Sequence, residues 1–169
     1  MPEPGVTSAP LDRGVTRSPL DQGVARSPLD DVRDLYSDAI RGHARRPAHR
    51  GRPDGVAAEA RGSNPMCGDR VDVFVRADAG RVAAARFEAR SCDVCAASAD
   101  LMCGAVPGLD LEAVRKLAHE VGEMARTGDG ARCPEALRPL SAVHEYPSRL
   151  RCVTLPWSAL VEAMEKSDG

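Results

Sequence analysis

Residues 64–69, NPMCGD, place a thiol and a carboxylate two positions apart. If this segment is extended, the side chains of Cys67 and Asp69 project from the same face, because side chains alternate along an extended chain. Thiolate and carboxylate are both anionic ligands for a borderline-soft metal such as zinc or ferrous iron. Pro65 opposes a helix here, and Gly68 lets the backbone approach a ligand closely. The segment therefore predicts half of a metal site.

Two further cysteines are candidate partners for this pair: Cys92, in SCDVC, and Cys152, in RLRCV. Cys92 is expected at a helix N-terminus, where free backbone N–H groups and the helix dipole favour a thiolate. Cys95 lies one helical turn further on and faces the same side. Taken alone, this Cys-x-x-Cys pattern fits half a zinc site, a dithiol redox pair or a chance pairing in an alanine-rich helix.

The remaining cysteines and the histidines have simpler interpretations. Cys103 is about 16 Å from Cys92 along the helix, at a rise of roughly 1.5 Å per residue, so the two cannot share a metal. We interpret Cys103 as a small buried residue, and Cys133 has no evident partner. The four histidines are interpreted as surface residues, because none has metal-type spacing to another: His43, His49, His119 and His144.

Composition limits the class of protein. The 169 residues suffice for one ordinary domain, and 23 Lys plus Arg against 25 Asp plus Glu give no reason to expect nucleic acid or an acidic membrane surface. There is no apolar run long enough to span a bilayer and no signal-peptide pattern at Met1, so we expect a cytoplasmic protein. In that reducing compartment, six cysteines indicate metal or persulfide chemistry rather than disulfides.

The N-terminal segment is repetitive. Residues 5–31 contain three copies of a nine-residue unit, GVTSAPLDR, GVTRSPLDQ and GVARSPLDD. A unit this short and this rich in Pro and Gly cannot bury a core, so residues 1–30 are predicted to be a disordered tail and residues 31–166 a folded domain. A docking peptide is the alternative. Just beyond, the basic run 41–52 is either a solvated loop or a patch that meets an acidic partner.

Hydrophobic periodicity predicts an α+β fold. We expect a helix through Val32 and Ile40 capped by Asp30 or Asp31, followed by a β-hairpin over residues 69–87 that turns at 78–80. Further helices are predicted over 92–106, from Asp110 to Gly128, from Pro134 and from 150 to about 165, with a polar tail from 166. This order favours helices packed on one face of a small antiparallel sheet.

Four segments then resemble, in order, the U-type iron–sulfur cluster assembly proteins (IscU, SufU and the N-terminal domain of NifU). They are Leu35-Tyr36 with its helix, 64–69, 87–102 and 146–157, and the similarity covers roughly residues 31–165. The resemblance implies a SufE/NifU-like fold in which three cysteines and one aspartate gather at one end. By position, these metal ligands are Cys67, Asp69, Cys92 and Cys152.

Details within the resemblance point to the SufU branch. The Isc-type proteins carry a histidine just before the last cysteine, where this chain has Arg151, and a Leu-Pro-Pro-Val-Lys chaperone-binding segment that is absent here. About 60 residues separate Cys92 from Cys152, enough for the extra helical segment of SufU proteins. Arg149 resembles a SufU arginine implicated in contact with the cysteine desulfurase.

The chain also departs from the family pattern. Cys95 adds a thiol beside the expected site, so the fourth ligand is either Asp69 or Cys95. Pro156 falls in the turn after Cys152 and cannot donate to the Cys152 carbonyl, which predicts a kinked or later-starting final helix. The tail before residue 31 has no counterpart.

The resemblance implies a protein that accepts persulfide sulfur from a SufS-like cysteine desulfurase and supports [2Fe–2S] assembly. It would act as a scaffold or as a zinc-dependent sulfurtransferase, with Zn²⁺ or iron bound, and would serve apo iron–sulfur proteins or downstream assembly factors. Cys67 is the expected sulfur acceptor, with Cys152 second. The alternative is a non-catalytic, structural zinc module that only binds a partner, and the partly polar setting of Cys67 on a Gly-containing loop argues against it.

Overall fold

The computed structural model describes residues 37–169. The predicted disordered tail, and the start of the helix expected around Val32, lie outside the described residues. The first described helix, α2 (Asp38–Arg45), begins after Ser37, whose hydroxyl accepts a hydrogen bond from the Ile40 N–H at 3.4 Å. Ile40 is fully buried and anchors this helix to the core.

The sheet has three antiparallel strands in the order β1 (Ala58–Asn64), β2 (Asp69–Asp78) and β3 (Arg81–Arg90). The β2–β3 hairpin confirms the predicted one, and its turn places Ala79 and Gly80 at φ 50° and 74°. Strand β1 was not predicted from the sequence. Its inward positions are small, and a Cβ on Gly62 would lie 3.0 Å from the Leu155 side chain, so this strand packs closely but gives little hydrophobic signal.

The connection between β1 and β2 corrects the prediction for residues 64–69. The segment is not extended: residues 65–68 form a turn, the Gly68 N–H donates to the Asn64 carbonyl at 2.8 Å, and Gly68 has φ 75°. Cys67 therefore lies in a hairpin turn and Asp69 is the first residue of β2. The alternation argument for pairing these two residues was wrong, and the turn brings them together instead.

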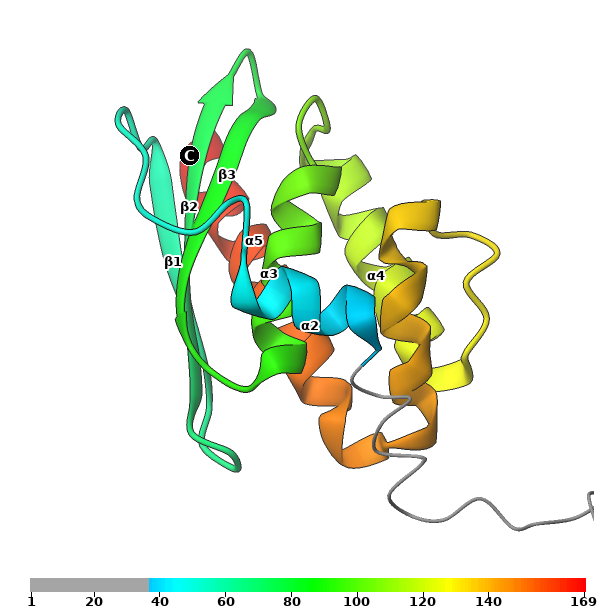
Figure 1. Ribbon diagram of the computed structural model, residues 1–169. Coiled ribbons are helices and arrows are strands. Elements are labelled where there is room, and N and C mark those ends of the chain that lie inside the picture. Colours follow the sequence, from blue (N-terminus) through cyan, green and yellow to red (C-terminus); the bar gives the residue numbers. More distant parts are fainter. Residues whose placement is uncertain (1–36) are drawn as a thin grey trace, which may run out of the picture.

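The helices cover one face of the sheet, as predicted (Figure 1). They are α3 (Asp93–Ala105), α4 (Leu111–Thr127), the 3₁₀ helices η2 (Glu135–Glu145) and η3 (Pro147–Arg149), and α5 (Leu150–Asp168). Asp110 caps α4 and Gly128 ends it in the left-handed conformation. The element starting at Pro134 is a 3₁₀ helix rather than an α-helix, and α5 continues through the expected polar tail.

The core lies between the sheet and the two central helices α3 and α5. Trp157 of α5 is buried, and its indole N–H donates to the Ser98 hydroxyl at 3.3 Å, which in turn donates to the Val153 carbonyl at 2.7 Å. This buried chain of hydrogen bonds joins α3 to α5. Helix α5 begins at Leu150, before Cys152, and continues through Pro156, so this proline does not set its start; a kink at Pro156 stays a prediction. None of the helices in residues 37–169 is long and apolar enough to cross a membrane.

Candidate metal centre

Cys67 is presented by the turn between β1 and β2. The Asn64 side chain, itself buried, shapes this turn because its amide oxygen accepts a hydrogen bond from the Met66 N–H at 3.1 Å. The Cys67 thiol lies 4.0 Å from the Asn64 carbonyl oxygen. Cys67 is an exposed residue and lines a surface groove.

Asp69 and Cys92 meet at the N-terminus of α3. Cys92 is the N-cap residue of this helix, and its N–H donates to Asp69 Oδ1 at 2.9 Å. The Cys92 sulfur lies 3.5 Å from Asp69 Oδ2. Asp69 is 5% exposed, so β2 delivers a buried carboxylate to the point where α3 begins. The prediction that Cys92 opens a helix is confirmed.

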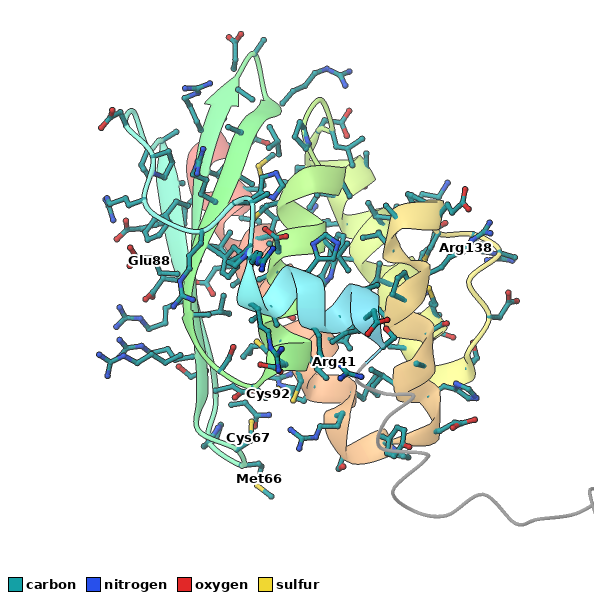
Figure 2. All side chains as sticks on the ribbon, in the orientation of Figure 1. Arg41, Met66, Cys67, Glu88, Cys92 and Arg138 are labelled. Atoms are coloured by element: carbon teal, nitrogen blue, oxygen red, sulfur yellow. The ribbon has the colours of Figure 1, made fainter. Side chains whose placement is uncertain are left out.

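Cys152 completes the cluster from the first turn of α5. It is buried, and one ligand atom from each of Cys67, Asp69 and Cys152 lies within 4.8 Å of the other two. Cys92 joins this group through its contact with Asp69. Figure 2 shows Cys67 and Cys92 at the same end of the molecule. Three elements far apart in the chain thus converge on one carboxylate.

The acidic groups of the cluster have shifted pKa values that suit the binding of a cation. Burial alone would raise the pKa of Asp69, but the Cys92 N–H and the neighbouring thiols donate to it and lower the pKa below its usual value. Burial raises the pKa of the Cys152 thiol, and the nearby Cys92 and Asp69 raise it further. These residues cannot all be anionic by themselves, and a bound divalent cation would compensate their charge.

The donor set fits zinc. Zinc in proteins is commonly tetrahedral, with thiolate sulfur at about 2.3 Å and carboxylate oxygen at about 2.0–2.2 Å. Cys67, Asp69 and Cys152 supply three such ligands close to one another, and the Cys92 thiol beside Asp69 supplies a fourth candidate. The same donors also suit ferrous iron and thiolate-ligated iron–sulfur clusters.

Residues 35–163 match the family model described as the NifU-like N terminal domain. The chain belongs to this family. It is 33% identical over 135 residues to the iron–sulfur cluster assembly scaffold protein IscU of Streptococcus pyogenes serotype M1, covering 79% of this chain and 84% of that protein. It is 30% identical over 138 residues to the zinc-dependent sulfurtransferase SufU of Bacillus subtilis (strain 168), covering 80% and 92%.

Solved structures agree on the fold. A crystal structure described only as that of a hypothetical protein is 32% identical and superposes with a TM-score of 0.71, covering 78% of this chain and 97% of the other. The N-terminal part of a nitrogen-fixing NifU-like protein from Brucella abortus has the same TM-score at 19% identity, with coverage of 82% and 97%. The NifU-like fold expected from the sequence is therefore confirmed.

Cys95 is not one of the three residues whose ligand atoms converge. Its side chain is fully buried in the core, and burial raises the pKa of its thiol to about 12. Buried Cys152 has the same two properties, so they do not separate a packing role for Cys95 from that of an alternative ligand, and the accessory role stays a prediction. Cys103 is buried as expected, and Cys133 is also buried near the start of η2.

Two of the histidines make a contact that their spacing does not predict. His43 Nδ1 lies 2.6 Å from one oxygen of Asp100, and His49 Nδ1 lies 3.1 Å from the other. The His49 N–H also donates to Asp100 at 2.9 Å, and the carboxylate is only 1% exposed. This contact ties α2 and the following loop to α3. An acidic residue on the buried face of an alanine-rich helix was the available signal.

A groove borders the exposed thiol. It has a volume of about 560 Å³ and is lined by Asn64, Met66, Cys67, Ser148, Arg149, Arg151 and Cys152. Met66 is 92% exposed, which is unusual for a large apolar side chain. Arg149 therefore lines the same groove as Cys67. Met66 was not predicted from the sequence to be a functional residue.

Proposed function

We propose that this protein supports iron–sulfur cluster assembly by accepting sulfur on Cys67 from a cysteine desulfurase, next to a metal held by Cys67, Asp69, Cys92 and Cys152. The observation that carries the proposal is the mixed exposure of the cluster. Cys67 is open to solvent, whereas Asp69 and Cys152 are 5% and 1% exposed. A structural zinc site is usually closed, so an accessible thiol at its edge favours a reactive role.

Each residue has a separate task in this proposal. Asp69, Cys92 and Cys152 hold the metal from elements fixed in the core, while Cys67 lies on a turn that reaches solvent. Bound zinc would keep the thiols deprotonated near neutral pH. Cys67, on the exposed turn, would supply the nucleophilic thiolate, while the buried Asp69, Cys92 and Cys152 would hold the metal.

The sulfur transfer is a thiol–persulfide exchange. The Cys67 thiolate attacks the terminal sulfur of the desulfurase persulfide, forming a new S–S bond as the original S–S bond breaks. The desulfurase cysteine leaves as a thiolate, and Cys67 becomes a persulfide. No external oxidant or reductant is required, and Cys152 is the nearest cysteine ligand that could take the sulfur onward.

The groove beside Cys67 is the proposed docking site for the desulfurase. Met66 offers an apolar anchor, and Arg149 and Arg151 add positive charge on the same side. An apolar residue ringed by charged groups is typical of a protein interface. Apo iron–sulfur proteins or downstream assembly factors would receive the product. Placement in the SufU branch, and a location in the cytoplasm, remain part of this proposal.

The relatives support two versions of the function. The Streptococcus pyogenes relative is named as a scaffold and the Bacillus subtilis relative as a zinc-dependent sulfurtransferase. In the first version a [2Fe–2S] cluster is assembled on the same donors; in the second, zinc stays bound and sulfur moves on. The non-catalytic zinc module is the contrasting function, and the exposure of Cys67 argues against it.

One experiment separates these functions. Protein purified with and without oxygen is analysed for zinc, iron and sulfide, and then incubated with a cysteine desulfurase and radiolabelled cysteine. Sulfur transfer should occur, and Cys67→Ser should abolish it, whereas Cys133→Ser should not. Zinc without sulfide identifies the carrier, and iron with sulfide identifies the scaffold. Full zinc content without any sulfur uptake would favour the structural module.

A further inference from the structure

The outer face of the sheet, opposite the helices, carries a cross-strand pair of like charges. Arg70 of β2 and Arg90 of β3 are Cα partners across the ladder, and both are exposed. Like charges directly opposite each other destabilise an antiparallel pair. The two arginines lie at the strand ends nearest the metal centre, since Arg70 follows Asp69 and Arg90 precedes Cys92 by two residues.

A third guanidinium is fixed beside this pair. The segment before β1 pairs with the edge of β3: the Gly51 N–H donates to the Phe87 carbonyl at 2.8 Å, and the Phe87 N–H donates to the His49 carbonyl at 3.1 Å. Arg50, between them, donates from Nη2 to the Ala89 carbonyl at 3.2 Å. Its charge is therefore held at the strand edge, close to Arg90.

The three arginines share one open cavity of about 320 Å³, which Asp72, Glu88 and Ala89 also line. Asp72 forms an ion pair with Arg61. Within residues 37–169, neither Arg50, Arg70 nor Arg90 forms an ion pair with a carboxylate. Figure 2 shows nitrogen-tipped side chains projecting into solvent on the side of the sheet where Glu88 is labelled. The positive charge of this cavity is thus available to a ligand.

We propose that Arg50, Arg70 and Arg90 form a docking site for an acidic segment of a partner protein. Guanidinium groups bind carboxylates through paired N–H donors, which gives both charge and geometric complementarity. Asp72 and Glu88 in the same cavity would repel a dense polyanion such as nucleic acid. They are compatible with a protein surface, where charges of both signs alternate. An acidic protein segment is therefore the occupant that fits best.

This arginine site is separate from the groove beside Cys67. The groove is lined from the β1–β2 turn, η3 and α5, whereas the arginine site lies on the outer face of β2 and β3. A protein bound at the arginines would lie beside the metal centre and leave the groove open. The inference adds a second partner surface to the proposed function, and binding there requires neither the metal nor sulfur transfer.

The like-charge pair provides a control for folding. Arg90→Glu would place a carboxylate opposite Arg70 and convert a repulsive cross-strand pair into an attractive one. The new carboxylate would also lie beside Asp72 and Glu88, which are themselves Cα partners, so the gain is offset and the melting temperature should stay close to that of the wild type. A variant that keeps its stability but binds an acidic ligand less well cannot owe its lost binding to misfolding.

The test uses the full-length protein and a fluorescent peptide in which glutamates alternate with serines, so that its charge is spaced as on a protein surface. Fluorescence anisotropy at low salt gives its affinity, and ¹⁵N-labelled protein identifies the amides that shift on binding. We expect the largest shifts near Arg70 and Arg90, and a loss of affinity of about tenfold or more in the Arg90→Glu variant. Arg138→Glu, an exposed position on η2 far from the sheet, should bind normally.

Three results would overturn the proposal. One is equal affinity in the wild type and the Arg90→Glu variant, and another is an equal loss in Arg138→Glu. The third is tighter binding by a single-stranded oligonucleotide that competes with the peptide, which would make the site a polyanion site. The readout is peptide affinity, so the result stands whether or not Cys67 accepts sulfur.

Discussion

The Cys92 N–H donates to Asp69 Oδ1 at 2.9 Å, so one carboxylate both caps helix α3 and faces the cysteines of the candidate metal centre. The second oxygen of Asp69 lies 3.5 Å from the Cys92 sulfur. The position of the ligands is therefore tied to the packing of α3 against β2. Because these two roles use different properties of the side chain, substitutions can separate them.

Asp69→Asn should keep the cap and lose most of the metal affinity. The amide oxygen can still accept from the Cys92 N–H, but the amide is not an anionic ligand. Asp69→Ala should lose both and lower the stability of the metal-free protein by roughly 1 kcal/mol. Urea unfolding of the metal-free proteins and zinc competition against a chromophoric chelator measure the two effects. Equal zinc affinity in Asp69→Asn and wild type would remove Asp69 from the ligand set.

Cys92→Ser should remove most of the bound metal. A serine hydroxyl stays protonated near neutral pH and is a poor substitute for a thiolate ligand. Elemental analysis of the purified variant gives the metal content, with Cys133→Ser as the matched control, because Cys133 lies outside the cluster. If Cys92→Ser retains a full metal equivalent with unchanged coordination, the ligand assignment is wrong.

Cys95 should be inert towards an alkylating reagent in the native protein at pH 8. The thiolate is the reactive form, and a pKa of about 12 together with complete burial leaves almost none of it accessible. Exposed Cys67 should react first in the metal-free protein. Mass spectrometry of digested samples taken over time measures the order. Early labelling of Cys95, or loss of metal in Cys95→Ala, would revive its role as an accessory thiol.

A chain starting at Asp30 should fold and bind metal like the full-length protein. The described core is built from residues 37–169, and the repeat removed by this truncation is rich in Pro and Gly. Melting temperature and zinc content of the two proteins provide the comparison. A large drop in either value on truncation would show that the repeat contributes to the domain.

The sequence predicted the elements that carry a strong period or a clear cap, such as the β2–β3 hairpin and α4 between Asp110 and Gly128. It missed β1, whose inward residues are too small to give an alternating hydrophobic signal. Residues 64–69 were expected to be extended, because the sequence does not specify that β1 precedes them and turns back there. Proximity of Cys67 and Cys152 came only from family resemblance, since no local pattern joins residues so far apart in the chain.

Polar contacts between residues far apart in the chain could not be predicted from the sequence either. Asp100 bonds to two histidines that are separated from it by 57 and 51 positions, and no spacing rule pairs them. The arginine site depends on strand register, which fixes Arg70 opposite Arg90 only once the hairpin has formed. The basic run 41–52 did indicate a candidate surface for an acidic partner, and Arg50 is the residue of this run that lines the arginine site.

The central claim is that Cys67 is the residue that receives sulfur. The most direct measurement is peptide mapping by mass spectrometry after incubation of the zinc-loaded protein with a cysteine desulfurase and cysteine, with free persulfides trapped by an alkylating reagent. We predict one added sulfur atom on the peptide that contains Cys67, formed before any on the peptide that contains Cys152. Sulfur found only on other cysteines, or on none while zinc stays bound, would contradict the account.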